Sequence, residues 1–178
     1  CTIADIKAYK PKSNSISNSQ VLFRDYKYDE AKIILKEMVE LLSQQLIEKN
    51  IETDCISLYI GYSKEFTVHS GGSRRLNSYT NLYKKLVYEF LKLYEETTIK
   101  NIPIRRIGIS FGRIQEQYSE QLNLFEDIES KAKERKLEKS IIEIKSKLGK
   151  NSVLKGMNLQ ECATTRIRNK LIGGHNGN

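Results

Sequence analysis

Apolar residues recur along the chain with two different spacings, which predict strands and helices in turn. Residues 19–24 alternate enough to predict a first strand, with Val21 and Phe23 on the same side. After them, apolar positions three or four residues apart predict a helix that Asp29 caps at its N-terminus and that stops at Asn50.

Further along, the same two spacings predict a hairpin, a second helix and a last strand. Residues 56–62 alternate between apolar and small or polar side chains, as in a strand with one buried face. The remaining predicted elements, in chain order, are a turn at 64–65, a strand at 66–68, a glycine- and serine-rich loop at 70–73, a helix over 80–97, and a strand over 104–114 in which Ile107, Ile109 and Phe111 share a face.

The order β-α-β-β-α-β predicts an α+β fold, a two-layer sandwich of a four-stranded antiparallel sheet with both helices on one face. We assign this domain to residues 16–118, a linker to 1–15 and a helical tail to 128–178. Small and polar residues would line the uncovered face of the sheet, which would then be flat enough to lie against a nucleic-acid groove. An ordinary solvated sheet face has the same pattern. The residues concerned are Ser57, Tyr59, Gly61, Arg106, Gly108, Ser110 and Gly112.

The charge of the chain favours a polyanionic partner. The formal net charge is +8 and the sequence pI about 9.3, with the excess of basic residues spread over the whole length. Three widely spaced cysteines without a CxxC pair favour neither a disulfide framework nor a zinc site, and we expect a cytoplasmic protein. No apolar run approaches the roughly 20 residues that span a bilayer, so we expect no membrane partner.

Three segments carry a resemblance to a known family: residues 9–13 with 17–20 and 24–26, residues 104–110 (IRRIGIS), and residues 121–125 (QLNLF). Taken together, they resemble the little finger of Y-family translesion DNA polymerases of the bacterial UmuC type. The first is similar to the linker and first strand of that DNA-binding domain, the second to its last strand, and the third to the bacterial sliding-clamp-binding motif. The resemblance covers roughly residues 1–125.

The resemblance implies duplex template–primer DNA as one partner and the family's paired arginines as contacts to the template backbone. One of Arg105 and Arg106 would face the helices and the other the open sheet, because neighbouring strand residues point to opposite faces. An edge pair that only aids solubility is the alternative. The predicted DNA-binding residues are Ser17, Ser19, Arg24, Arg74, Arg75, Arg105 and Arg106.

The bacterial sliding clamp is the second implied partner, with residues 119–127 as the contacting segment. An extended peptide can bury Leu122, Leu124 and Phe125 in an apolar groove while the Gln121 amide bonds at the rim. Alternatively, these apolar residues begin the next helix or pack on the sheet.

No catalytic residue, metal ligand, cofactor or small-molecule ligand is predicted for this chain. The resemblance implies that the catalytic palm, with its magnesium, precedes Cys1. Two alternatives stay open: a free-standing α+β nucleic-acid-binding module, and an adaptor that only docks on the clamp. An RNA module of the RRM type is disfavoured because residues 107–114 carry no aromatic stacking motif.

Overall fold

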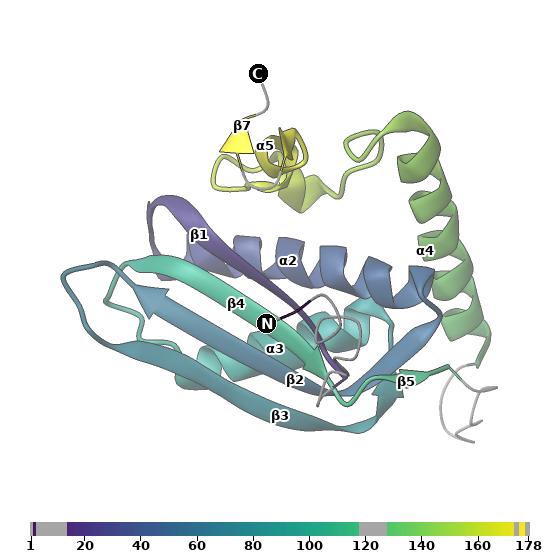
Figure 1. Cartoon of the computed structure of the whole chain (residues 1–178), viewed down its shortest axis with the longest axis horizontal. Helices are drawn as coiled ribbons and strands as arrows, with labels where there is room; N and C mark the ends of the chain where they lie inside the picture. The colour runs from purple at the N-terminus through teal and green to yellow at the C-terminus, as the bar shows by residue number, and fades with distance from the viewer. Residues whose placement is uncertain (1, 3–13, 118–127, 173–174, 177–178) are drawn as a thin grey trace.

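The computed structural model describes residues 2, 14–117, 128–172 and 175–176. Figure 1 shows a sheet with two helices, α2 and α3, on one of its faces. The strand order is β1-β4-β2-β3, and all neighbouring strands are antiparallel. The elements of the two layers are β1 (Ile16–Tyr26), α2 (Tyr28–Glu48), β2 (Ile51–Tyr62), β3 (His69–Thr80), α3 (Tyr83–Thr97), β4 (Ile104–Gly112) and β5 (Gln115–Glu116), which pairs with the start of β2.

This arrangement confirms the predicted α+β sandwich, to which β5 adds a short fifth strand. The core lies between the layers, because every second residue of a strand points toward the helices. On α3, Leu86 and Phe90 are fully buried, and the Phe90 ring lies 5.8 Å from that of Phe111. The buried positions of the central strands are those that the alternation predicts: Ile56, Leu58, Ile60, Tyr62, Ile107, Ile109 and Phe111.

On β1, Val21 and Phe23 share a side, as predicted, and this side faces solvent. Their exposed fractions are 65% and 52%, whereas Gln20 and Leu22 between and beside them are buried. Because β1 is an edge strand, its two faces differ less in sequence than those of β2 and β4. Alternation alone therefore predicted which residues of β1 share a face, but not which of the two faces packs against the helices.

The predicted strand at residues 66–68 and the predicted loop at 70–73 are both wrong. Strand β3 begins at His69 and includes the glycine–serine stretch, while Phe66 lies in the connection from β2 and is 41% exposed. Gly71 pairs with Tyr59 at a positive φ of 119°, where a Cβ would lie 2.1 Å from the Leu58 carbonyl oxygen. Pairing with β2 thus overrides the low strand propensity of glycine and serine.

The helix starts also differ from the prediction. Helix α2 begins at Tyr28, with Lys27 rather than Asp29 at the N-cap, because the Glu30 carboxylate accepts the Lys27 backbone N–H at 2.9 Å. Helix α3 begins at Tyr83 instead of residue 80. The predicted stop of the first helix is confirmed, since Asn50 adopts a positive φ of 53° directly after it.

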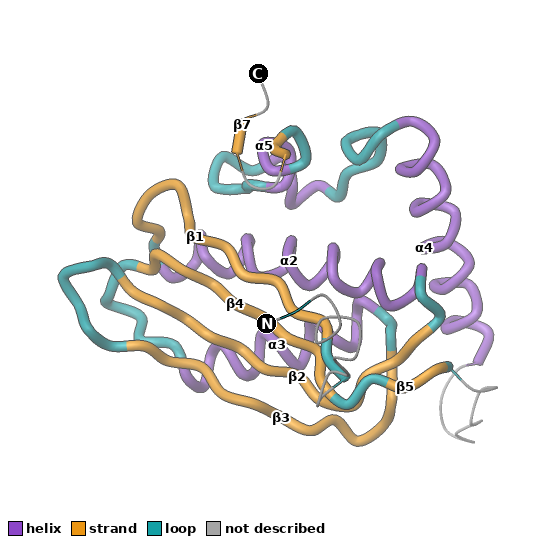
Figure 2. Tube along the Cα trace, viewed as in Figure 1, coloured by secondary structure: helices purple, strands orange, loops and turns teal. Residues whose placement is uncertain are grey.

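The charged run at 128–148 forms a helix, α4 (Ile128–Leu148), as predicted. Beyond it the chain turns back along α2 rather than extending away (Figure 2). The returning segment contains a 3₁₀ helix, η1 (Gly156–Leu159), a short α5 (Thr165–Arg168) and a small hairpin of β6 (Leu171–Ile172) and β7 (His175–Asn176). The tail is therefore a third part of the structure, on the helix side of the sheet.

Candidate nucleic-acid interface

Four serines form a row across the open face of the sheet. Ser17 of β1 pairs with Ser110 of β4, Ser110 pairs with Ser57 of β2, and Ser57 pairs with Ser73 of β3. The hydroxyls of Ser57 and Ser73 are 2.8 Å apart. With strands about 4.8 Å apart, the row extends over roughly 14 Å. It offers hydroxyl donors in a line without long side chains above them.

A shallow hollow of about 490 Å³ lies over this row and the next one, in which Ser19, Gly108 and Tyr59 are neighbours. Gly108 keeps the floor low, since a Cβ there would already touch the Tyr59 side chain at 3.5 Å. The hollow is lined by Ser17, Asn18, Ser19, Ser57, Leu58, Tyr59, Arg106, Gly108, Ile109 and Ser110. The open face is therefore flat to slightly concave.

At one end of the hollow, Arg106 lies beside an exposed aromatic ring. Its Nε donates to the Ser19 Oγ at 3.2 Å, and its guanidinium carbon lies 5.7 Å from the Tyr59 ring centroid. The Tyr59 ring in turn stacks on His69, with centroids 5.8 Å apart and 21° between the planes. These contacts hold a cation at the open face in a defined orientation.

Outside the hollow, next to the end of β4, the buried carboxylate of Asp54 holds two arginines. Arg113 Nε donates to Asp54 Oδ1 at 2.9 Å, and Arg75 Nε donates to Oδ2 at 3.3 Å. The hydrogen bonds to Asp54 and Tyr79 raise the pKa of Arg113. The side chains of Arg75 and Arg113 are 69% and 53% exposed, so both cations stay accessible.

Arg113 is absent from the residues predicted from sequence. It follows the last residue of β4 and adopts a positive φ of 52°, and its side chain bonds Asp54. No periodicity marks such a residue. The signal in the sequence is only a basic residue after a glycine at a strand end.

The predicted division of the arginine pair between the two faces is wrong. Ile104 and Ile107 are both fully buried, which strict alternation forbids for residues three apart. The register explains this, because Tyr62 pairs with Ile104 while Gly61 pairs with Arg106, so Arg105 is the extra residue of a β-bulge. Neither arginine enters the core. The Arg105 guanidinium lies 3.7 Å from the carboxylate of Asp25, and 34% of its side chain is exposed.

Two other predicted residues form ion pairs away from the serine row. Arg24 binds both carboxylate oxygens of Glu30, at 2.6 and 3.1 Å, and this contact lowers the Glu30 pKa to about 2. Arg74 lies on the helix side of β3, where it pairs with Glu96 and, at 3.6 Å, with Glu89 of α3. Ser17, Ser19, Arg75 and Arg106 are the predicted residues that the sheet brings to the open face.

The predicted clamp-binding residues Gln121, Leu122, Leu124 and Phe125 lie outside the described residues. Within the described part of the chain, no group of three or more His, Cys, Asp or Glu side chains is arranged to hold a metal ion. No helix in that same part is long and apolar enough to cross a membrane.

Comparison with known proteins gives the family. A family model described as the impB/mucB/samB family C-terminal domain matches residues 13–124, more than half of the chain. The chain is also 30% identical over 169 residues to a protein of Bacillus subtilis (strain 168) named "Putative UV-damage repair protein UvrX". That alignment covers 90% of this chain and 38% of the relative, so the chain spans well under half of the relative's length.

Two solved structures match part of this chain at low sequence identity. One is a complex of the β-clamp processivity factor and the little finger domain of PolIV, with a TM-score of 0.43, 15% identity, and coverage of 64% of this chain and 100% of that one. The other is a post-insertion binary complex of Dbh DNA polymerase, with a TM-score of 0.41, 17% identity, and coverage of 65% and 34%. On the match to the family model, this chain belongs to the impB/mucB/samB family and is the C-terminal part of a Y-family DNA polymerase.

Proposed function

We propose that the open face of the sheet binds the sugar–phosphate backbone of duplex template–primer DNA during translesion synthesis. The observation that carries the proposal is the uncovered serine row with oriented arginines on both sides of it along the strands, Arg106 on one side and Arg75 with Arg113 on the other. Hydroxyls and guanidinium groups are donors that suit phosphate oxygens. Contacts to phosphates position a duplex without reading its sequence, which a polymerase moving along any template requires.

A duplex suits this surface better than an unpaired strand. Proteins that bind single strands offer aromatic rings on which successive bases stack. Here the central ring, Tyr59, is already stacked on His69 and lies beside Arg106. Its role in the proposal is to orient the arginine rather than to receive a base.

In this proposal the rest of the polymerase carries out phosphoryl transfer. The palm would hold the catalytic magnesium through its carboxylates, and this chain would grip the duplex and add no catalytic group. The protein would act in the bacterial cytoplasm, and both described cysteines, Cys55 and Cys162, are free thiols, which fits a reducing compartment.

We further propose that residues 121–125 dock the polymerase on the bacterial sliding clamp. The support is the sequence QLNLF, an isolated apolar cluster followed by the charged residues Glu126, Asp127 and Glu129. An apolar peptide of this kind gains affinity by burying a few side chains in a groove of its partner. The segment follows β5 in the chain, and the last described residue before it, Gln117, donates its backbone N–H to the Asn50 carbonyl at 3.0 Å.

The DNA-binding proposal is tested by fluorescence anisotropy with two duplexes of unrelated sequence over a range of salt concentrations. Wild type should bind both equally, and affinity should fall steeply with salt. Arg106→Ala and Arg113→Ala should each weaken binding to both duplexes and lower the salt slope by about 1. The matched control is Lys92→Ala, which removes one positive charge from an exposed position of α3, on the other face of the sheet.

Salt-insensitive binding confined to one sequence would contradict the proposal. Equal losses in Lys92→Ala and Arg106→Ala would show that only net charge matters and that the open face has no special role. Full clamp affinity combined with no measurable DNA binding would instead favour the adaptor.

A further inference from the structure

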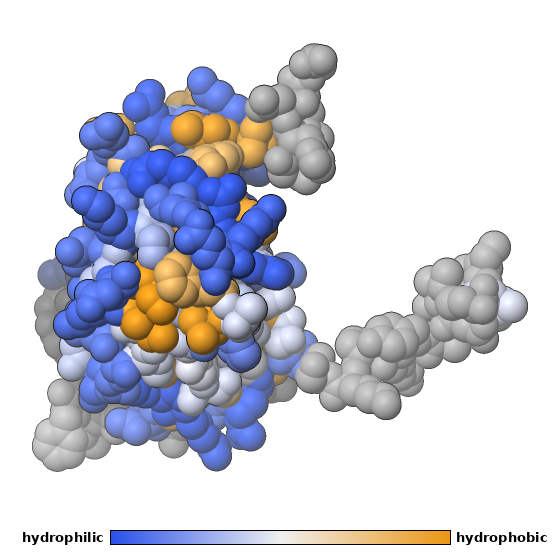
Figure 3. All heavy atoms as spheres, turned by 90° about the vertical axis from the view of Figure 1, so that its left-hand side faces the viewer, coloured by the Kyte–Doolittle hydropathy of each residue, from blue (hydrophilic) through white to orange (hydrophobic). Residues whose placement is uncertain are grey.

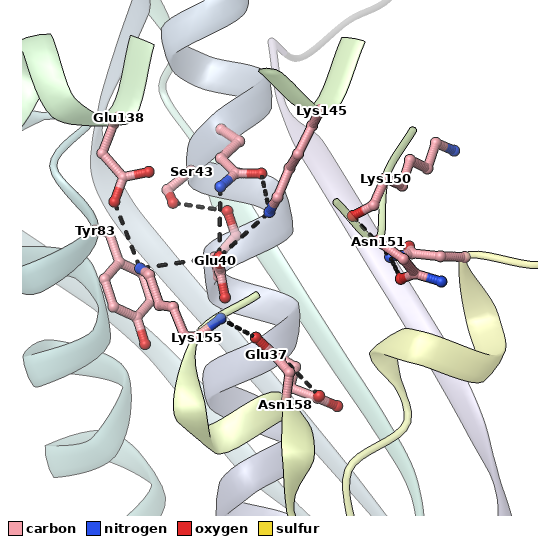
Figure 4. Close-up of polar contacts among 12 residues, drawn as sticks. Glu37, Glu40, Ser43, Tyr83, Glu138, Lys145, Lys150, Asn151, Lys155 and Asn158 are labelled. Atoms are coloured by element: carbon pink, nitrogen blue, oxygen red, sulfur yellow. Dashed lines mark hydrogen bonds and ion pairs between the residues drawn. The ribbon is translucent and has the colours of Figure 1, made fainter. Parts of the chain in front are cut away.

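The C-terminal tail is fastened to α2 by a buried carboxylate. Glu37, 4% exposed, accepts hydrogen bonds from Asn158 Nδ2 at 2.9 Å, from the Thr164 backbone N–H at 2.8 Å and from the Thr165 N–H at 3.2 Å. Thr164 also accepts a hydrogen bond from Gln20 Nε2 of β1 at 3.0 Å. Figure 4 shows Glu37 and Asn158 of these residues. One wall beside α2 is therefore fixed in place by buried hydrogen bonds.

A second set of buried polar contacts fixes α4 to the same helix (Figure 4). Glu40 of α2 lies 3.5 Å from the ammonium of Lys145 and 3.9 Å from that of Lys155. Lys155 also reaches Glu138 at 3.4 Å, and its ammonium lies 3.4 Å from the centroid of the Tyr83 ring. The carboxylate of Glu40 is thus already compensated within the protein.

A pocket of about 550 Å³ lies between these two walls, in the size range of ligand-binding clefts. Its apolar lining comes from Met38 and Leu41 of α2 and Ile142 of α4, and Leu41 is 40% exposed. The helix-facing side of β1 contributes Gln20. The pocket therefore lies mainly on the helix side of the sheet, and Asn18 of the edge strand β1 lines both it and the hollow of the open face.

One cation in this pocket, Arg168, forms no direct contact with an acceptor in the described part of the chain. Arg168 of α5 lines the pocket, and among the described residues its guanidinium makes no hydrogen bond or ion pair. Burial lowers the pKa of Arg168, although the nearby charge of Glu37 opposes that shift. A half-buried guanidinium without a partner is costly, and an anionic group would relieve that cost. Lys150 also lines the pocket, and its backbone carbonyl accepts a hydrogen bond from Asn169, the residue after Arg168.

We propose that the pocket between α2, α4 and α5 binds an acidic segment of a partner protein. An apolar side chain of that segment packs on Met38 and Leu41, and a neighbouring carboxylate binds Arg168. Glu48 also lines the pocket and repels a carboxylate. It lies eleven residues beyond Glu37, about 16 Å along α2. The two charges therefore orient the segment, with its acidic end toward α5.

A small probe with the same chemistry tests this site in the whole chain. N-acetyl-leucine carries one apolar side chain and one carboxylate, and N-acetyl-leucinamide is its neutral counterpart. In ¹H–¹⁵N NMR titrations, the acid should shift the amide signals of Leu41, Thr165 and Arg168 with a Kd of about millimolar, as expected for so small a ligand. The amide should bind at least about tenfold more weakly, a difference of about 1.4 kcal/mol.

Substitutions on α5 separate the pocket from general charge. Arg168→Gln should reduce binding of the acid to the level of the amide, and Arg168→Lys should restore most of it. The matched control is Arg166→Gln, which removes the same charge from an exposed position of the same helix outside this pocket. Its affinity for the acid should equal that of wild type.

Equal binding of acid and amide would overturn the proposal, as would equal losses in the Arg166 and Arg168 variants. Absence of any saturable shift with either probe would also overturn it. Displacement of the acid by duplex DNA would identify the pocket as part of a nucleic-acid site instead. If Arg168→Gln does not fold, the comparison of Arg168→Lys with Arg166→Gln and the acid-to-amide ratio in wild type still decide the question.

Discussion

Arg106 of β4 donates a hydrogen bond to the hydroxyl of Ser19 on β1, 3.2 Å away, although 87 positions separate the two residues. Of all the hydrogen-bonded strand pairs in this sheet, β1 and β4 are the farthest apart in sequence, and the bond joins them. It also fixes a cation on the open face beside the serine row. The open face is therefore a surface that exists only once β1 and β4 have paired.

The serine row predicts a loss of DNA affinity without a change in salt dependence. Ser57→Ala and Ser110→Ala should each cost about 0.5–1.5 kcal/mol, because each removes one hydrogen bond to a phosphate. A neutral donor releases no counterion, so the salt slope of wild type should be kept. Anisotropy titrations at several salt concentrations measure both quantities.

Ser140→Ala, on the exposed surface of α4, is the control for this comparison, and its affinity should not change. If the salt slope of a serine variant falls as far as that of Arg106→Ala, the substitution disturbs the arginines rather than removing a direct contact to a phosphate.

The Glu37 contacts predict that the tail contributes to stability. Glu37→Gln keeps the shape of the side chain but replaces an acceptor oxygen with a donor, which leaves buried N–H groups of the tail without a partner. The free energy of unfolding should fall by about 1–3 kcal/mol, measured by urea denaturation. Hydrogen exchange at Thr164 and Thr165 should accelerate.

Glu48→Gln is the matched control, because Glu48 lies on the same helix and is exposed. Its unfolding free energy should stay within about 0.5 kcal/mol of wild type. If Glu37→Gln is equally mild, the tail is held mainly by contacts other than this carboxylate.

The Arg24–Glu30 pair predicts acid sensitivity. Hydrogen bonds from Arg24 and from the Lys27 backbone lower the pKa of Glu30 from 4.5 to about 2 in the folded state. A carboxyl whose pKa is lowered by folding stabilises the fold above its unfolded pKa and loses that contribution as the pH falls toward the folded value. Stability should therefore drop between about pH 4.5 and pH 2, by a modest amount because solvent screens this exposed pair.

Thermal unfolding at pH values from 6 to 2 checks this expectation. Glu30→Gln should have a shallower loss of the unfolding midpoint over that interval than wild type, and Arg24→Ala should do the same because it removes the main partner. Parallel curves for all three proteins would show that this pair does not set the acid response.

The clamp-binding proposal predicts that two apolar side chains carry most of the affinity. Replacing Leu124 and Phe125 together with alanine should cost about 2–4 kcal/mol, roughly a 30- to 1,000-fold loss. Asn123→Ala, at the spacer position, should cost far less, and DNA binding should survive in both variants. Calorimetry against the sliding clamp measures the affinities, and an unchanged affinity of the double variant would remove the motif from the mechanism.

The predicted order of strands and helices, the buried faces of β2 and β4, and Asn50 as the stop after α2 are all confirmed, because each depends on local spacing. The open-face position of Arg106 follows from the same alternation, whereas Arg75 lies in β3, a strand that the sequence pattern did not predict. Sequence also carried the family resemblance, through short segments whose order along the chain matched the little finger.

Other features depend on contacts between distant residues, which no local pattern contains. The bulge at Arg105 and the inclusion of Gly71 in β3 follow from the register with β2. Arg24 and Arg74 are basic residues like Arg106, and only the positions of Glu30, Glu89 and Glu96 separate them from it.

The sequence by itself determined which residues form the two layers, since the period of its apolar positions matches the geometry of strands and helices. The tertiary structure alone decided which charges stay available for a partner. How much of an arginine stays exposed, and which carboxylate orients it, depends on packing across the chain. Two contacts depend on packing in this way: the one between Asp54 and Arg113, and the one between Glu37 and Thr164, which are 127 positions apart.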